Sequence, residues 1–314
     1  MDTAKEAIEL HEKWGGKIDT TAKCEVKTSR DLALAYTPGV AAPCQEIAKE
    51  KENVYRYTIK ANTVAVVSDG SAVLGLGNIG PEAAMPVMEG KAVLFKEFGG
   101  VNAFPICLDT QDTEEIIETV VRISPGFGGI NLEDISAPRC FVIESELKKR
   151  LSIPVFHDDQ HGTAIVVLSG LINALRLKQM KKEDCHIVVN GSGAAGIAIS
   201  KLLLKYGFKH LILCDSKGIV SSKSERLNDV KREMLEITNL EDISGTLADA
   251  MKGADIFIGV STPGMVTEDM VRSMNPDPII LAMANPVPEI MPDIAKKAGA
   301  RIVGTGRSDR KSVV

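Results

Sequence analysis

The sequence predicts an α/β protein made of two consecutive domains, each with a mostly parallel sheet. Three observations favour this class. Short β-rich runs alternate with longer helical patterns almost throughout the chain. One of these runs leads into a G-x-G-x-x-G sequence that opens a helical pattern, which is typical of a Rossmann-type dinucleotide-binding unit. The chain has 314 residues, enough for two domains that each bury a core of their own.

In the first half, strands are expected at TVAVVSD, NAFPICLD, GGINLEDI and IPVFHDD. Helical patterns over residues 82–98, 113–123 and 139–150 lie between them. Parallel strands need crossover connections of this kind, so the first half is predicted to be an α/β domain with a parallel sheet.

In the second half, strands are expected at HIVVNG, HLILCD, ADIFIGV, PIILAMAN and ARIVGTG. The run TAIVVLSGLINALRL carries apolar residues at helical spacing and is predicted to connect the two halves. We therefore place one domain over residues 1–161 and a Rossmann-type domain over residues 162–314. Ligands of open α/β sheets bind beyond the carboxyl ends of the strands, so the residues that follow each strand are the ones to examine.

The composition excludes several classes of protein. A net charge of -5 gives no electrostatic reason to bind nucleic acid or an anionic membrane. The charged N-terminus lacks an apolar signal core, and no apolar run reaches membrane-spanning length, which predicts a cytoplasmic protein. The six cysteines form no C-x-x-C pair, and Cys107, Cys185 and Cys214 in apolar runs are expected to be buried reduced thiols.

The G-x-G-x-x-G sequence occurs twice, and only the second copy has the accessory features of a phosphate cradle. It consists of Gly191, Ser192, Gly193, Ala194, Ala195 and Gly196. A strand pattern ends at its first glycine, and a helical pattern follows and closes on Gly207. Such a helix N-terminus would offer unpaired amides to a pyrophosphate. In the first copy, Gly75–Gly80, a gap separates the strand from the glycines, so this segment is expected to fold closely around a small substrate.

The second strand of the Rossmann pattern ends in Asp215, where an acid that binds the ribose hydroxyls is expected. A carboxylate there would repel the 2′-phosphate of NADP, so Asp215 favours NAD. Lys217, two residues further on, could meet that phosphate and leaves NADP possible.

Two predicted strands of the first half end in adjacent acids, Glu133–Asp134 and Asp158–Asp159. A parallel sheet would bring both pairs to one edge, where burial of several carboxylates requires a compensating cation. Oxygen ligands suit Mg²⁺ or Mn²⁺. The alternatives are a solvated loop for each pair and a zinc site that uses His157 and His161, which we expect to be structural or to support the ligands.

Six segments of the chain together resemble malic enzymes of the short bacterial form. They are AYTPGVAAPC, SDGSAVLGLGNIGPEAAMPVMEGKAVLFK, NLEDI, FHDDQHGTA, GSGAAG and ANPVPE. The resemblance covers nearly the whole chain, in the order of the family. It implies oxidation and decarboxylation of (S)-malate to pyruvate and CO₂ by a homodimer, with NAD or NADP as cofactor and Mg²⁺ or Mn²⁺ as the metal.

The resemblance also implies roles for individual residues. Tyr36 becomes the general acid, Lys91 the general base and a substrate contact, and Asp158 a neighbour that supports Lys91. Asn285 would face the substrate near the nicotinamide, and residues 192–195 would line the pyrophosphate. The implied metal ligands are Glu133, Asp134 and Asp159. The chemistry is consistent with these groups, because hydride loss from C2 requires a base for the 2-hydroxyl proton and a Lewis acid for the keto oxygen.

The sequence departs from the family pattern in two places. Larger relatives carry an arginine near Ser71–Ala72 for the malate carboxylate, and this chain has none there. Family members also continue beyond GTGRSD into further substrate contacts, whereas this chain runs into RKSVV, so we expect a truncated protein with impaired activity. The alternatives are malolactic chemistry, which yields lactate at the same site, and a non-catalytic cofactor-binding protein.

Overall fold

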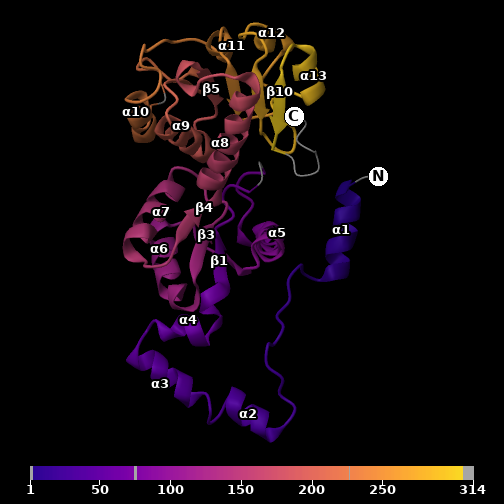
Figure 1. The fold of residues 1–314 in the computed structure, drawn as a ribbon, viewed down its shortest axis with the longest axis vertical. Helices are drawn as coiled ribbons and strands as arrows, with labels where there is room; N and C mark the ends of the chain where they lie inside the picture. Colours follow the sequence, from indigo (N-terminus) through magenta and orange to yellow (C-terminus); the bar gives the residue numbers. More distant parts are fainter. Residues whose placement is uncertain (1–2, 74–75, 226, 307–314) are drawn as a thin grey trace. The chain divides into compact units, whose positions relative to one another are not determined.

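The computed structural model describes residues 3–73, 76–225 and 227–306 (Figure 1). The chain divides into two compact units, Met1–Phe156 and His157–Val314. The domain boundary predicted from the sequence, after residue 161, falls a few residues beyond this division. The predicted α/β class is confirmed, since each unit contains a sheet of mostly parallel strands covered by helices.

The first unit is built on a four-stranded sheet with the order β2-β1-β3-β4. β1 pairs in parallel with both β2 and β3, so the carboxyl ends of these strands lie at one edge of the sheet. The central strands are almost wholly buried, which explains their near-continuous apolar sequences. The strands are β1 (Thr63–Ser68), β2 (Asn102–Cys107), β3 (Gly129–Leu132) and β4 (Val155–His157).

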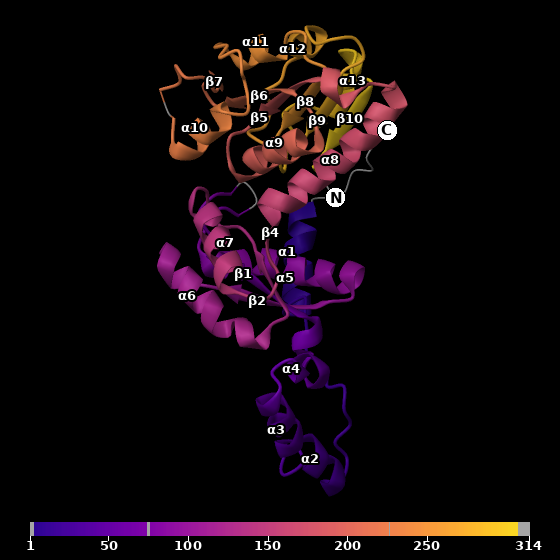
Figure 2. The same ribbon diagram turned by 60° about the vertical axis from the view of Figure 1, so that its left-hand side comes forward.

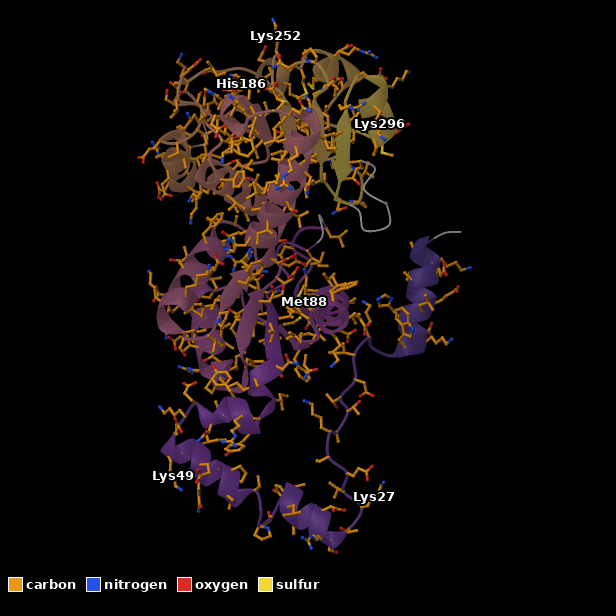
Figure 3. The ribbon with its side chains drawn as sticks, in the orientation of Figure 1. Lys27, Lys49, Met88, His186, Lys252 and Lys296 are labelled. Atoms are coloured by element: carbon orange, nitrogen blue, oxygen red, sulfur yellow. The ribbon has the colours of Figure 1, made fainter. Side chains whose placement is uncertain are left out.

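Helices cover both faces of this sheet, with α5 on one side and α6 and α7 on the other (Figure 1). α5 (Pro81–Gly99) packs on β1 and β2. Its fully buried Met88, labelled in Figure 3, lies in a core cluster with Val66 and Ala84. On the other face, α6 (Thr113–Ile123) packs against α7 (Arg139–Arg150).

The N-terminal part of the first unit is a chain of short helices with little buried surface. α1 (Thr3–Trp14), α2 (Ser29–Ala35), α3 (Ala41–Lys49) and α4 (Asn53–Tyr57) precede the sheet. None of the described residues of α2, α3 and α4 is buried. The segment instead exposes apolar side chains to solvent, among them Leu32, Leu34, Tyr36 and Val40.

The second unit contains a six-stranded sheet with the order β10-β9-β8-β5-β6-β7 (Figure 2). The strands are parallel except for β7, which pairs antiparallel with β6. The order reverses between β8 and β5, and at such a reversal an open α/β sheet forms a ligand crevice. The strands are β5 (His186–Asn190), β6 (His210–Asp215), β7 (Gly218–Ile219), β8 (Ile256–Gly259), β9 (Ile279–Ala282) and β10 (Ile302–Thr305).

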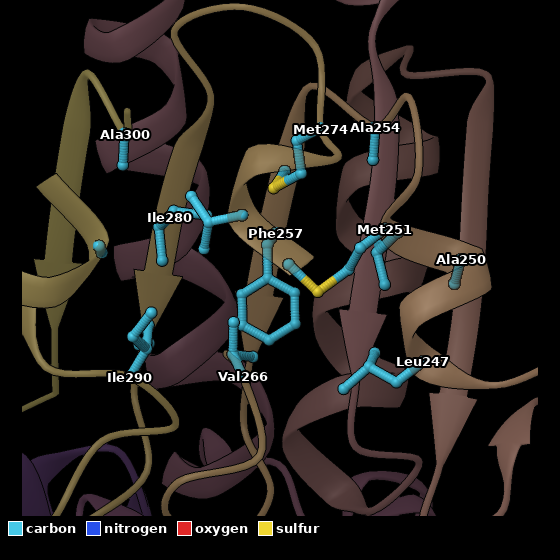
Figure 4. Packing of buried hydrophobic residues seen from close by; sticks show 14 of the residues in the cluster. Leu247, Ala250, Met251, Ala254, Phe257, Val266, Met274, Ile280, Ile290 and Ala300 are labelled. Atoms are coloured by element: carbon cyan, nitrogen blue, oxygen red, sulfur yellow. The ribbon is translucent and has the colours of Figure 1, made fainter. Parts of the chain in front are cut away.

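Alternate side chains of these strands point to opposite faces, so each face needs its own cover. Phe257 and Ile280 pack in one cluster with Leu247 and Met251 of α11 (Figure 4). The cluster also takes in residues of α12 and α13. α8 and α9 pack against each other. The helices of this unit are α8 (Asp158–Lys178), α9 (Ala194–Tyr206), α10 (Asp229–Leu235), α11 (Leu247–Met251), α12 (Glu268–Arg272) and α13 (Pro292–Lys297).

The cysteines are all free thiols, and Cys185 and Cys214 are buried, as predicted. Burial raises the pKa of Cys185 to about 11 and that of Cys214 to about 12. Cys107 is only half-buried, because its strand β2 lies at the edge of the first sheet. Among the described residues, none of the helices combines the length and apolar character needed to cross a membrane.

Candidate functional site

An acidic cluster lies at the carboxyl ends of β3 and β4. Glu133 and Asp134 directly follow β3, and Asp159 stands two residues beyond β4. One carboxylate oxygen from each of the three lies within 4.8 Å of the others. Glu133 and Asp134 are 5% and 4% exposed, so their charges are largely removed from water. Carboxylates this close together are consistent with a site for a divalent cation, since a cation would offset their mutual repulsion.

The local structure differs from the sequence prediction in one respect at this edge. The strand β4 ends at His157, and Asp158 and Asp159 form the first turn of α8 rather than the end of a strand. A helix N-terminus favours negative side chains through its dipole, which makes this turn a suitable place for the two acids. His157 is fully buried. Neither His157 nor His161 belongs to the acidic cluster found among the described residues.

Lys91 reaches the acidic cluster from α5. Its Nζ lies 3.1 Å from Oε1 of Glu133, and its side chain is 20% exposed. A cation 3.1 Å from a largely buried carboxylate is held in place by charge as well as by packing. A mobile surface lysine, the ordinary state of a helix lysine, would instead be exposed.

The first glycine-rich segment joins β1 to α5. Gly75 lies outside the described residues, so the segment is described around it. Gly70 has a φ of +67°, and a side chain there would collide with the backbone of Gly80. The amides of Ile79 and Gly80 both donate to the carbonyl of Gly70, which closes the loop. Ala72 donates to the carbonyl of Asp134 over 3.1 Å, so this loop is attached to the acidic cluster and α5 begins immediately after it.

The second glycine motif forms a strand, a tight turn and a helix. β5 ends at Asn190, and α9 begins at Ala194 and ends before Gly207, as predicted. A Cβ on Gly196 would lie 1.7 Å from the carbonyl oxygen of Gly191, so only glycine lets the helix approach the strand end this closely. The first turn of α9 therefore points its free amides at the crevice beyond β5, where a pyrophosphate would bind.

Asp215 ends β6 beside this turn, in a cavity of about 230 Å³. One carboxylate oxygen accepts the backbone N–H of Lys217 over 2.8 Å. The other lies 2.5 Å from Nζ of Lys231, which belongs to α10. Lys231 could not be predicted from the sequence, because no spacing rule links a lysine on a later helix to the end of β6. Lys217, the cation suggested by the sequence, contacts Asp215 through its backbone N–H. The cavity is lined by Asn190, Gly191, Ser192, Asp215, Ser216, Lys231, Ser261, Thr262 and Met265.

Comparison with known proteins identifies the family. Residues 15–148 match the malic enzyme N-terminal domain, and residues 160–306 match the malic enzyme NAD-binding domain. A bifunctional malic/malolactic enzyme of Bacillus subtilis is 58% identical over 310 residues, which cover 98% of this chain and 76% of the relative. The chain belongs to the malic enzyme family.

Two further relatives extend the comparison. An NAD-dependent malic enzyme of Geobacillus stearothermophilus is 58% identical over 94% of this chain, which spans 62% of that relative's length. The crystal structure of an NAD-dependent malic enzyme from Thermotoga maritima superposes with a TM-score of 0.94 at 52% identity, and the match covers 96% of this chain and 81% of that one. The chain thus spans between 62% and 81% of the length of these relatives. The segment RKSVV, from which the sequence analysis expected a truncation, lies outside the described residues.

The malic enzyme resemblance also assigned Asn285 and Tyr36 to the site, and the structure shows the surroundings of each within its own unit. Asn285 follows β9 and donates through its side chain to the carbonyl of Gly306 over 3.3 Å. Its loop is fixed by the fully buried Glu289, whose carboxylate accepts the amides of Ser261 and Ala284. Tyr36 ends α2 and is 68% exposed. α2 lies well away from α5, which carries Lys91, in both views of the first unit (Figures 1 and 2).

Proposed function

We propose that this chain catalyses the oxidative decarboxylation of (S)-malate to pyruvate and CO₂, with reduction of NAD or NADP and with Mg²⁺ or Mn²⁺ bound. The observation that carries the proposal is the convergence of Glu133, Asp134 and Asp159, with the ammonium group of Lys91 3.1 Å from Glu133. This is the donor set that a hard divalent cation needs beside a base. When bound, the metal supplies a Lewis acid for the oxygen on C2, and the cofactor accepts the hydride.

The chain's own residues move the protons. Lys91 in its neutral form accepts the proton of the 2-hydroxyl group as the hydride leaves C2. After CO₂ departs, C3 must gain one proton to become the methyl group of pyruvate, and Tyr36 is the proposed donor. One proton is accepted and one is donated, so the reaction converts malate and oxidised cofactor into pyruvate, CO₂ and reduced cofactor without net proton exchange. Asn285 and residues 191–196 hold the nicotinamide cofactor against the substrate.

The test is a malate-dependent assay of cofactor reduction, with and without Mn²⁺, on the wild type and on Lys91→Ala. Loss of the base should lower kcat by about 10²- to 10⁴-fold. The matched control is Lys96→Ala on the same helix, whose side chain contacts Asn102 on the surface. Equal activity of Lys91→Ala and Lys96→Ala would contradict the role of Lys91, and full activity in excess EDTA would contradict the metal.

A malolactic reaction is the second function to consider, since the Bacillus subtilis relative is named a bifunctional malic/malolactic enzyme. The same residues would oxidise and decarboxylate malate. Pyruvate would then regain the hydride at its keto carbon and take one proton from solvent on its keto oxygen, which gives lactate and the oxidised cofactor. Lactate formed in the absence of net cofactor reduction would favour this reaction. Pyruvate and reduced cofactor formed in equal amounts would favour the first.

We propose NAD as the preferred cofactor, with Lys231 as the residue that admits NADP. Asp215 stands at the ribose position and can accept hydrogen bonds from the hydroxyl groups of NAD. Lys231 neutralises this carboxylate and lines the same cavity, so its ammonium group is placed to contact a 2′-phosphate. Lys231→Met should therefore reduce kcat/KM for NADP by about tenfold or more and change NAD much less. An equal loss of kcat/KM with both cofactors would contradict this role and would mean that Lys231 only holds Asp215 in place.

We propose further that the protein is a homodimer in which the N-terminal helices of each copy contact the other. None of the described residues of α2, α3 and α4 is buried within their own unit, and Leu34 and Tyr36 are 66% and 68% exposed. Exposed apolar side chains concentrated on one segment are typical of an interface. In such a dimer, Tyr36 would be supplied to the Lys91 site of the partner.

Subunit complementation tests this arrangement. Tyr36→Phe and Lys91→Ala should each be inactive alone. When the two variants are mixed and allowed to exchange subunits, a mixed dimer contains one site with both groups intact, so about one quarter of the wild-type activity should return. No recovery, with exchange verified by mass, would place Tyr36 and Lys91 in the same copy. A monomer in solution would contradict the dimer itself.

A further inference from the structure

Arg139, the first residue of α7, is bonded to three separate strand-end loops of the first unit. Its Nη2 lies 2.8 Å from the carboxylate of Asp69, which follows β1 and whose side chain is fully buried. Its Nη1 donates to the carbonyl of Gln111, in the loop after β2, over 2.6 Å. Nη2 also donates to Ser136, in the loop after β3, over 3.0 Å. A planar guanidinium can make these contacts at once, which a single ammonium cannot.

The hydroxyl of Ser71 is the centre of this network. It donates to Asp69 over 2.6 Å and accepts from Nη2 of Arg139 and from the amide of Ser136, both over 2.9 Å. Ser71 is 8% exposed, so these bonds form in a largely dry environment where they are strong. The adjacent Ala72 amide binds the carbonyl of Asp134. The network thus attaches the loop after β1 to the backbone on both sides of Ile135.

Asp134 needs this support because its backbone is strained. Its φ is +92°, a conformation that side-chain-bearing residues rarely adopt. Such a conformation costs on the order of 1–3 kcal/mol and persists only where surrounding contacts enforce it. The strained backbone directs the carboxylate of Asp134 toward those of Glu133 and Asp159. Relaxation of this one residue would move a member of the acidic cluster.

We propose that Arg139 is a positioning residue for the divalent metal: with Asp69, Ser71 and Ser136 it holds Asp134 in the strained conformation that completes the acidic cluster. The inference rests on the metal site of the proposed function. It does not give Arg139 any contact with the metal. Residues that orient metal ligands in this way typically change metal affinity by about 10- to 100-fold.

The experiment measures Mn²⁺ binding directly, from the electron paramagnetic resonance signal of free Mn²⁺ during titration of the metal-free full chain. Arg139→Lys keeps a positive charge beside Asp69 but loses the two NH₂ groups of the guanidinium that contact separate loops. Ser71→Ala keeps the ion pair between Arg139 and Asp69 but loses the hydroxyl at the centre of the network. Both variants should raise the Kd for Mn²⁺ by about tenfold or more. The matched control is Arg150→Lys at the other end of α7, where the arginine pairs with Glu118 on the surface; its Kd should not change.

A kinetic readout separates positioning from general damage. The Mn²⁺ concentration for half-maximal activity should rise in both variants, while kcat at saturating Mn²⁺ and NAD affinity in the second unit stay near wild type. Wild-type Kd values for Mn²⁺ in Arg139→Lys and Ser71→Ala would overturn the inference. The variant Asp159→Asn distinguishes this failure from failure of the metal site itself. If Asp159→Asn also binds Mn²⁺ with the wild-type Kd, the proposed metal site is wrong. If Asp159→Asn loses Mn²⁺ while Arg139→Lys and Ser71→Ala bind it normally, only the role of Arg139 is wrong. If Arg139→Lys does not fold, Ser71→Ala decides.

Discussion

Replacement of Gly196 by alanine should damage the second unit in two measurable ways. A Cβ at this position would lie 1.7 Å from the carbonyl oxygen of Gly191 and 2.8 Å from its carbonyl carbon, both backbone atoms that cannot rotate away. Real Cβ atoms essentially never approach closer than 3.0 Å, so the start of α9 must move by about 1.3 Å from the end of β5. Overpacking of this kind costs about 1–3 kcal/mol. In a unit of this size, each kcal/mol lowers the melting temperature by about 2–4 °C.

The same displacement moves the amides of the first turn of α9 away from a bound pyrophosphate. Hydrogen bonds to a charged group contribute about 1.5–3 kcal/mol each, so loss of one should weaken NAD binding by about tenfold or more. The matched control is Gly193→Ala. A Cβ there would meet no atom within 4 Å, so thermal stability should not change, while a methyl group in the open crevice should still hinder the cofactor.

Thermal unfolding followed by circular dichroism and calorimetric titration with NAD measure the two effects. Gly196→Ala should lower both the melting temperature and the NAD affinity, and Gly193→Ala should lower the NAD affinity alone. A Gly196→Ala protein with the same melting temperature as the wild type would refute the close approach of α9 to β5. A Gly193→Ala protein that binds NAD normally would refute the placement of the pyrophosphate at this turn.

Three further outcomes are expected. Saturating Mn²⁺ should raise the melting temperature of the protein, because a ligand that binds only the folded state stabilises it, and Asp159→Asn should abolish this rise. In a thiol titration of the native protein at neutral pH, the exposed Cys24 and Cys44 should react quickly. Cys185 and Cys214 should react only after unfolding, since burial raises their pKa to about 11 and about 12 and keeps them as protonated thiols; fast labelling of either would contradict their burial. Glu289→Gln should destabilise the second unit by about 1–3 kcal/mol, because an amide cannot accept from both Ser261 and Ala284, and an unchanged melting curve would rule this out.

The α/β class and the second glycine motif were predictable from the sequence because both depend on short-range order. A buried parallel strand must be apolar along its whole length, and HIVVN and IILA show this without reference to any partner. The close approach of Gly196 to Gly191 likewise involves residues five positions apart. The prediction that the two glycine motifs have different tasks also rests on local spacing, because only one of them has a strand directly before it.

Other features depended on contacts that no spacing encodes. The acids that follow β3 and β4 were predicted to meet because parallel strands end at one edge, but the turn of α8 that carries Asp159 was expected to be strand. Lys231 lies beside Asp215 only because α10 packs near the end of β6. No spacing in the sequence sets Arg139 apart within the predicted helix 139–150, and its bonds to three loops exist because β1, β2 and β3 end side by side.

The sequence by itself therefore determined the strands of both sheets apart from β7 and the end of β4, and it indicated which glycine turn can face a pyrophosphate and which residues could serve as acids, bases and ligands. The tertiary structure alone decided how charges are paired: Lys91 with Glu133, Lys231 with Asp215, and Arg139 with the buried Asp69. The physical reason is the range of the forces involved. Backbone preference and apolar periodicity act over a few residues, whereas an ion pair forms wherever the fold brings two side chains together, at any separation along the chain.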